Sequence, residues 1–282
     1  MDAGRIAKRV WRAMGEDDLL LVAAGVGFYL LLALFPALTA FVTLYGLFLD
    51  PRSAVDQLSA LEGVVPPSVM EVVAGRVQAL AAEPAGRLGA GFALSLVIAL
   101  WGANGGVKAV MDGLNIVFDL GERRGFVKRN LVALWLMAGA VVLFAVMVIV
   151  LAVVPAVLAL FPLGVAGEVA LAVLRWPVLL VVVGLGLALL YRFGPCRMAA
   201  DWRWITWGSA LATAGWMAAS LGFAWYARSL ADFDASYGAM AVPVALLLWV
   251  WLSMVVVLLG AEVDAVMEQD RAQTAGPAGR DG

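Results

Sequence analysis

The residues best suited to chemistry in this 282-residue chain lie within one short stretch, residues 101–115. Four polar side chains recur there at intervals of four, four and three positions. Side chains at these intervals lie on one face of a helix. The stretch therefore predicts a helix with a polar stripe, formed by Asn104, Lys108, Asp112 and Asn115.

Two interpretations of this stripe stay open. In the first, Gly102, Gly105 and Gly106 let a second helix approach closely, and Asn104 hydrogen-bonds across the crossing. Lys108 then only extends toward the inner membrane interface. In the second, the same face lines an inward-facing cavity where Lys108 meets an anionic group. The spacing alone does not separate a structural crossing from a substrate path.

Two other apolar stretches end on the same side as the stripe. One finishes at Tyr191 and Arg192, and the other finishes at Gly260 and Glu262. Glu262 is a candidate partner for Lys108 or Arg192. Ion pairs at helix ends near lipid head groups are often structural, so this pairing does not by itself indicate a transport path.

The composition argues against most kinds of catalysis. The chain has no histidine, so it lacks an imidazole base, a Ser-His-Asp triad and any histidine metal ligand. The scattered acids and the net charge of −2 do not suggest a nuclease or a nucleic-acid-binding surface. A Walker A motif is also missing. We expect no catalytic residues, no metal and no cofactor.

The overall composition indicates an integral membrane protein. Hydrophobic residues make up 64% of the chain and charged residues 14%, whereas soluble domains are about half apolar and a quarter charged. A helix needs about 20 apolar residues to cross a bilayer. We predict an all-α fold with six spans, of which the first should kink or tilt at Pro36. They cover residues 19–49, 88–110, 130–154, 170–192, 204–227 and 240–263.

The segments outside the spans have distinct predicted roles. Residues 1–18 read as an interfacial helix, and 50–87 as two short amphipathic helices on the outer face. The transmembrane domain covers 19–268, and the polar tail 269–282 is expected to be disordered. Six spans with both termini in the cytoplasm place most of the Lys and Arg residues inside, as the positive-inside rule requires.

The predicted spans carry no Asp, Glu, Lys or Arg at their centres. Proton relays and ion-coupled carriers usually place an ionisable group there. An amphiphile with an anionic head and apolar tails is therefore a better substrate hypothesis than a small ion. The alternative is a non-catalytic scaffold that binds an envelope partner through residues 50–87 or the basic loop 121–129. The oligomeric state is not indicated by the sequence.

Several motifs together resemble one family. The sequence is similar to the YihY/BrkB family of bacterial inner-membrane proteins, once labelled ribonuclease BN. The resemblance spans about residues 20 to 268. It rests on Ala23–Tyr29 with Leu34-Phe35-Pro36, Trp101–Gly106 with Leu114-Asn115, Tyr191–Pro195 with Trp202-Arg203-Trp204, Ser236-Tyr237-Gly238, and Trp249-Val250-Trp251 with Gly260-Ala261-Glu262.

This resemblance implies six transmembrane helices in a bacterial inner membrane, with both ends in the cytoplasm. It links members to serum resistance and, in a related branch, to export of a lipid A precursor. The ribonuclease label is regarded as mistaken. Membrane lipids are then the expected partners. Tyr29, Tyr191 and Tyr237 lie within the motifs and complete the substrate-path candidates, which also include Asn104, Lys108, Asn115, Arg192 and Glu262.

Overall fold

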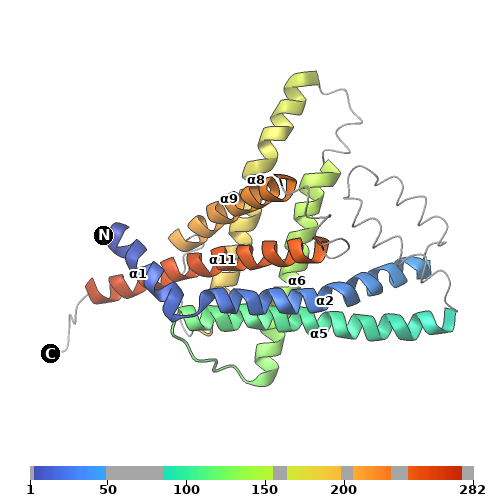
Figure 1. The fold of residues 1–282 in the computed structure, drawn as a ribbon, viewed down its shortest axis with the longest axis horizontal. Helices are drawn as coiled ribbons and strands as arrows, with labels where there is room; N and C mark the ends of the chain where they lie inside the picture. The colour runs from blue at the N-terminus through green and yellow to red at the C-terminus, as the bar shows by residue number, and fades with distance from the viewer. Residues whose placement is uncertain (1–2, 49–84, 155–163, 198–205, 230–240, 275–282) are drawn as a thin grey trace. The chain divides into compact units, whose positions relative to one another are not determined.

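The computed structural model describes residues 3–48, 85–154, 164–197, 206–229 and 241–274 (Figure 1). Every regular element in these ranges is helical. The prediction of an all-α fold is thus confirmed. Residue 237 and nearly all of the predicted outer insert, 50–84, lie outside the described residues.

A helix occupies each of the six stretches predicted to span the membrane. A seventh, α1 (Ala3–Glu16), forms from the predicted interfacial segment, and a π-helical turn that was not predicted, Ile149–Val153, continues α6. The six long helices are α2 (Leu19–Phe48), α5 (Ala85–Val117), α6 (Phe126–Val148), α8 (Gly164–Phe193), α9 (Trp207–Ser229) and α11 (Ala241–Thr274).

Five of these helices are long and apolar enough to cross a bilayer. The crossing segments are Leu19–Ala37, Gly91–Val117, Phe126–Leu151, Val173–Phe193 and Pro243–Arg271. The remaining long helix, α9, has 23 residues but is rich in Ala, Gly, Ser and Thr, so it is less apolar than the others. A sixth span therefore stays a prediction.

Two features of the helices differ from, or add to, the sequence prediction. α11 continues to Thr274, so residues 269–274, predicted to be disordered, are helical. They are ordered because Gln269 and Asp270 accept hydrogen bonds from Arg9 of α1. α2 also runs through Pro36 as one helix.

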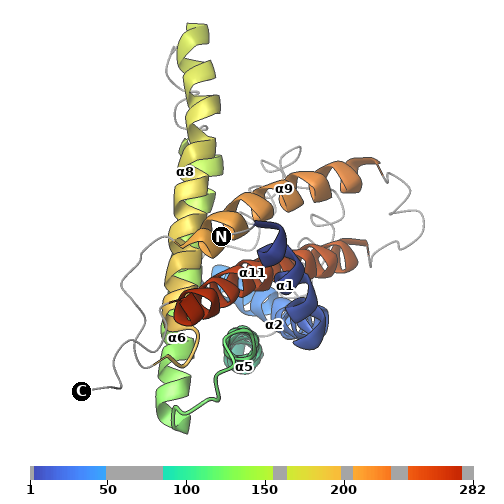
Figure 2. The ribbon, with the colours of Figure 1, turned by 90° about the vertical axis from the view of Figure 1, so that its left-hand side faces the viewer.

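The chain divides into two compact units. Unit 1 comprises residues 1–24, 107–224 and 251–282, and unit 2 comprises residues 25–106 and 225–250. The core of unit 1 includes Leu19, Leu114 and Leu258, each completely buried or nearly so. Within the same unit, α6 and α8 run side by side (Figure 2). The rings of Trp135 on α6 and Phe193 on α8 meet edge to face, with their centroids 4.9 Å apart.

Within unit 2, α2 and α5 cross closely. A Cβ atom on Gly102 would lie 3.0 Å from the Cβ of Ala33, and one on Gly105 would lie 2.7 Å from the ring of Tyr29. These distances are shorter than a normal carbon–carbon contact of about 3.5–4.0 Å. The two glycines therefore permit a helix approach that larger residues would prevent.

Candidate functional site

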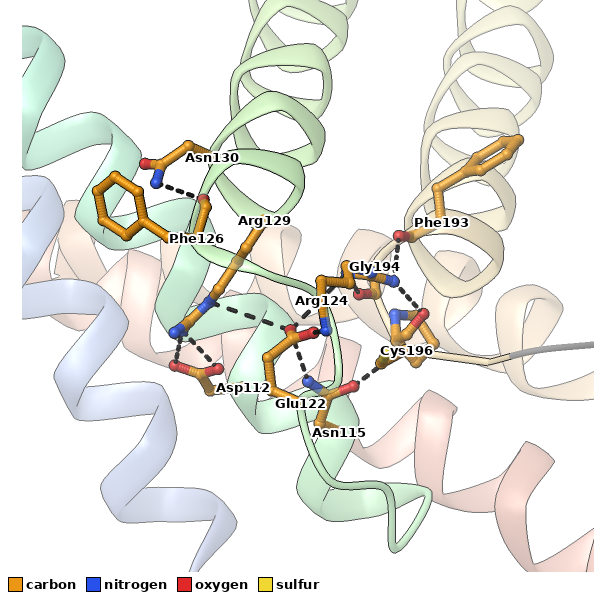
Figure 3. Close-up of polar contacts among 11 residues, drawn as sticks. Asp112, Asn115, Glu122, Arg124, Phe126, Arg129, Asn130, Phe193, Gly194 and Cys196 are labelled. Atoms are coloured by element: carbon orange, nitrogen blue, oxygen red, sulfur yellow. Dashed lines mark hydrogen bonds and ion pairs between the residues drawn. The ribbon is translucent and has the colours of Figure 1, made fainter.

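The richest group of polar contacts in unit 1 lies where α5, α6 and α8 end or begin (Figure 3). We call it the helix-end cluster. At its α6 side, Arg129 Nη2 donates to both carboxylate oxygens of Asp112 at 2.7 Å. This ion pair joins the last turns of α5 to the first turn of α6. The cluster comprises Asp112, Asn115, Glu122, Arg124, Arg129 and the backbone of residues 193–196.

Asn115 lies at the centre of the helix-end cluster and is 4% exposed. Its Nδ2 donates to Glu122 Oε2 at 3.3 Å, and its Oδ1 accepts the backbone N–H of Cys196 at 2.7 Å. Both ends of the amide are thus used. Asn115 therefore links the loop after α5 to the loop after α8. The two hydrogen bonds also satisfy its amide, since buried polar groups in folded proteins are generally hydrogen-bonded.

Glu122 receives several donors. Burial alone would raise the pKa of its carboxyl, but the backbone N–H of Arg124, the donors at Cys196 and Asn115, and the Arg124 charge together lower that pKa below its ordinary value. The backbone bond from Arg124 to Glu122 Oε1 is 2.9 Å long. Glu122 is therefore held ionised as an acceptor.

Arg124 completes the cluster by capping α8. Its guanidinium donates to the backbone carbonyls of Phe193 at 3.2 Å and Gly194 at 2.9 Å, and also to that of Pro195. The last carbonyls of a helix have no partner within the helix, and a cation at that end also matches the helix dipole. Arg124 therefore satisfies the C-terminus of α8 from a different loop.

The chemistry available to the helix-end cluster is limited by these pairings. Asp112 is paired with Arg129, and Glu122 with Arg124 and Asn115. Among the described residues, no group of three or more His, Cys, Asp or Glu side chains is arranged to hold a metal ion. The arrangement supports a clamp that fixes three helix ends, and it offers no open base or ligand.

A second set of contacts in unit 1 joins α8 and α9 to α11. Tyr191 donates its hydroxyl to the carbonyl of Val257, and Asp264 Oδ1 accepts the N–H of Gly208 at 2.8 Å. A Cβ on Gly260 would lie 2.6 Å from the Tyr191 hydroxyl and 2.7 Å from the carbonyl oxygen of Gly208. The structure thus brings Tyr191 and Gly260 together at a tight helix crossing.

The other candidates of unit 1 have separate surroundings. Lys108 is half-buried, and its charge acts on Asp112 one turn further along α5. The guanidinium of Arg192 stacks over the ring of Phe193 at 5.4 Å. Glu262 is buried beside Asp17, the residue that follows α1. The close neighbour of Glu262 is therefore the acid Asp17, whereas the sequence suggested Lys108 or Arg192 as its partner.

Among the candidates of unit 2, Asn104 has the most unusual position. Its Oδ1 atom is buried and has no hydrogen-bond partner within the described ranges. The ring of Tyr29 packs against Gly105, the residue that follows Asn104 on α5. A Cβ on Gly106 would lie 3.5 Å from the Cβ of Tyr29. The described side chains of unit 2 include no Asp, Glu, Lys or Arg.

Sequence reasoning missed Arg124, Glu122, Arg129 and Asp17 as structural centres. Arg124 and Arg129 were counted only as inner charges, because their partners are backbone carbonyls or acids on other helices. One signal was available for Glu122: Glu-Arg-Arg-Gly directly before the start of α6 places an acceptor close to backbone N–H groups that have no partner within a helix. The pairing of Asp17 with Glu262 had no local signal.

Comparison with known proteins adds a family and several relatives. A family model described as "Virulence factor BrkB" matches residues 10–281. "Putative ribonuclease-like protein YfkH" of Bacillus subtilis is 30% identical over 253 residues, which are 88% of this chain and 89% of that protein. The UPF0761 membrane protein RSc1559 of Ralstonia nicotianae is 27% identical over 263 residues, 91% of this chain and 57% of that protein.

A UPF0761 membrane protein of Albidiferax ferrireducens is 28% identical over 274 residues, 93% of this chain. The match covers only 62% of that relative. The chain therefore spans about three-fifths of the length of the two UPF0761 relatives, but most of the length of YfkH. No solved structure matches this chain.

Proposed function

This membrane protein belongs to the virulence factor BrkB family, and from that premise we propose that it moves a lipid or another anionic amphiphile through a bacterial inner membrane during envelope biogenesis. The proposal rests on the contrast between an uncharged apolar region and a small number of polar groups along α5.

The observation that carries the proposal is the buried, unpaired amide oxygen of Asn104. A buried polar group without a hydrogen bond costs free energy, and within a membrane span it usually has a functional reason. A lipid head group carries hydroxyl or ammonium donors beside its phosphate, so it could satisfy Asn104 Oδ1 in passing. A substrate of this kind would use the hydrogen-bonding capacity that the described protein groups leave unused.

The described side chains of unit 2, the unit that contains Asn104, favour an amphiphile over an ion. None of them is Asp, Glu, Lys or Arg, and they include exposed apolar side chains such as Phe28, Leu94 and Trp101. A small ion would need charged or multiply coordinating groups along its path. Apolar tails need only the hydrocarbon-like surface that these side chains provide.

Cations near the helix ends support an anionic head group as the preferred class. Lys108 follows Asn104 by one turn on the continuous helix α5. Phosphate groups attract such a cation from a distance through long-range electrostatics. We further propose that both termini face the cytoplasm, since exposed basic residues gather on α1 and after α5. They are Arg5, Lys8, Arg12, Arg123 and Lys128.

Transport can be tested with proteoliposomes that contain phosphatidylglycerol carrying a fluorescent tail. A membrane-impermeant reductant quenches only the outer-leaflet dye, so the slow phase of quenching reports movement between leaflets. Asn104→Leu is expected to slow this phase by about tenfold, the equivalent of one lost hydrogen bond. The matched control is Asn130→Leu, since the Asn130 amide only donates to the Phe126 carbonyl of its own helix.

Equal rates for the wild type and for empty liposomes would overturn transport of this lipid and favour the alternative, a scaffold for an envelope partner that binds residues 50–87. Faster passage of a small ion, abolished by Asn104→Leu, would overturn the amphiphile class.

We also propose that the chain is not an enzyme, although YfkH carries a ribonuclease-like name. The absence of histidine throughout the sequence and the paired state of Asp112 and Glu122 support this proposal. RNA cleavage by highly purified protein that disappears in Glu122→Gln, with the fold retained, would contradict it.

A further inference from the structure

Acidic residues from three segments of unit 1 gather where α1 passes into α2. Asp17 and Asp18 form the junction between the two helices and follow Glu16, the last residue of α1. Asp119 follows the end of α5, and Glu262 lies on α11. The charges of Glu16, Asp18 and Asp119 all act on Asp17.

Backbone hydrogen bonds hold the junction in a defined turn. The N–H of Asp17 donates to the carbonyl of Ala13 at 2.8 Å, and the N–H of Leu21 donates to that of Asp18 at 2.9 Å. Asp18 has a φ of 49° and Asp119 a φ of 51°, in the left-handed region that few residues other than glycine adopt. Two constrained turns thus set the positions of their acidic side chains.

Glu262 is the buried member of this group. It is 3% exposed, and its Oε2 atom is buried with no hydrogen-bond partner in the described part of the chain. Its carboxyl and that of Asp17 lie within reach of a shared hydrogen bond. Such a bond needs a proton, because two ionised carboxylates offer only acceptors.

Among the described residues, the charges that chiefly act on Asp17 and Glu262 come from acidic side chains. Burial raises the pKa of the Asp17 carboxyl first, and the negative charges of Glu16, Asp119 and Asp18 raise it further. The hydrogen bond with Glu262 offsets this only in part. Two adjacent carboxyl groups without a cation cannot both ionise at low cost, so they titrate as a pair.

We propose that Asp17 and Glu262 form a proton-binding site, in which one shared proton fastens the α1–α2 junction to α11. The ion pair of Arg9 with Asp270 fastens α1 to the same helix further along. Release of the proton leaves two like charges facing each other and frees the junction from α11. This site is independent of the proposed transport activity, and its tests need no transported substrate.

The proton, and not a metal ion, is the ligand that the geometry favours. In the ranges that the structure describes, these acids do not form a group arranged to hold a metal. A shared proton needs only the two facing oxygens. It also explains how an almost completely buried glutamate lacks any basic partner among the charged groups that act on it.

Infrared spectroscopy of the purified full-length protein in lipid nanodiscs detects the proton directly. At neutral pH the wild type should show a carbonyl band from a protonated carboxylic acid that shifts in heavy water. Asp17→Asn and Glu262→Gln should each remove this band, while Glu268→Gln should keep it. Glu268 lies on the same helix and is paired with Arg197 at 2.8 Å. A band of unchanged intensity in both variants would overturn the proposal.

Thermal unfolding, followed by tryptophan fluorescence, gives a second test. A proton bound by the folded but not the unfolded chain makes stability fall as pH rises, by up to tenfold in the folding equilibrium constant for each pH unit. The wild type should lose melting temperature as pH rises above the ordinary range of a carboxyl group. Asp17→Asn should lose less, because the amide can donate to an ionised Glu262, and Glu268→Gln should behave like the wild type.

Asp17→Asn is the decisive variant if Glu262→Gln fails to fold, since Asp17 is the more accessible member of the pair. Parallel slopes for the wild type and Asp17→Asn would contradict a shared proton. A cation site would replace the proton site if two results came together. The infrared band would be missing, and calcium or sodium chloride, compared at constant ionic strength, would stabilise the wild type but neither variant.

Discussion

Two asparagines, one in each unit of the chain, use their amides in opposite ways. In unit 1, the amide of Asn115 makes hydrogen bonds at both ends, to Glu122 and to the backbone of Cys196. In unit 2, the amide of Asn104 keeps a buried oxygen with no partner among the described residues. Both asparagines lie on α5, eleven positions apart.

The difference separates positions that hold the fold from a position with unused binding capacity. Paired polar groups such as Arg124 and Asp264 join helix ends through backbone atoms, so their replacement should change stability. A buried amide oxygen without a partner adds no hydrogen bond to the fold and costs desolvation. Its replacement should change binding instead. The following variants test this division.

The largest effect is expected for Gly260→Ala in unit 1. A Cβ there would lie 2.5 Å from the Ala212 Cβ and 2.7 Å from the Gly208 carbonyl oxygen. Neither atom can move without shifting a helix, so overpacking should cost about 3 kcal/mol or more. Thermal unfolding in detergent measures it. Gly222→Ala, with no atom within 4 Å of the new Cβ, is the control. Equal melting temperatures for the two variants would mean that the crossing is loose.

Arg124→Ala should follow closely. It removes the donors to the carbonyls at the end of α8 and leaves Glu122 with Arg129 as its one remaining ion-pair partner among the described residues. Removal of one member of a partly buried charged network typically costs about 3 kcal/mol. The neighbouring Arg123 is exposed, so Arg123→Ala should change the free energy of unfolding by less than about 0.5 kcal/mol. Similar unfolding curves for both variants would show that the capping of α8 is dispensable.

The two asparagines allow a direct comparison. Asn115→Leu leaves the Cys196 N–H without its acceptor and Glu122 without one donor, and should destabilise by about 1–3 kcal/mol. Asn104→Leu removes an amide oxygen without a partner and should leave the melting temperature unchanged or raise it. The division between the units would fail if Asn104→Leu were the more destabilising of the two.

The sequence predicted the helices well because apolar stretches of about 20 residues have few alternatives in a bilayer. It also placed Asn104 and Asn115 on one helix. It could not distinguish their roles, since Asn115 depends on Glu122 and on the backbone of Cys196, 81 positions away. The extension of α11 to Thr274 was missed for the same reason, because Arg9 stabilises it from the other end of the chain.

Gly105→Ala in unit 2 should have a smaller effect than Gly260→Ala. The new Cβ would lie 2.7 Å from the Tyr29 ring, but a side chain can rotate more easily than a backbone carbonyl. We expect a loss of about 1–2 kcal/mol, near the low end for overpacking. Gly91→Ala on the same helix has open space and should be neutral or slightly stabilising. A double variant, Gly105→Ala with Tyr29→Leu, should recover part of the loss if the ring is the obstacle.

The smallest effect concerns acid stability and distinguishes two carboxyl groups of unit 1. The pKa of Glu122 is lowered in the folded chain, so its stabilisation is present above the ordinary glutamate value of 4.5 and is lost as pH falls through the lowered value. The pKa of Asp17 is raised, so its contribution has the opposite sign and weakens as pH rises. Glu122→Gln should therefore flatten the limb in which stability falls below pH 4.5, while Asp17→Asn should flatten the limb in which stability falls as pH rises. Melting temperatures measured from pH 3 to about 8 separate the two limbs. If both variants changed the same limb, Glu122 and Asp17 would not belong to separate polar groups.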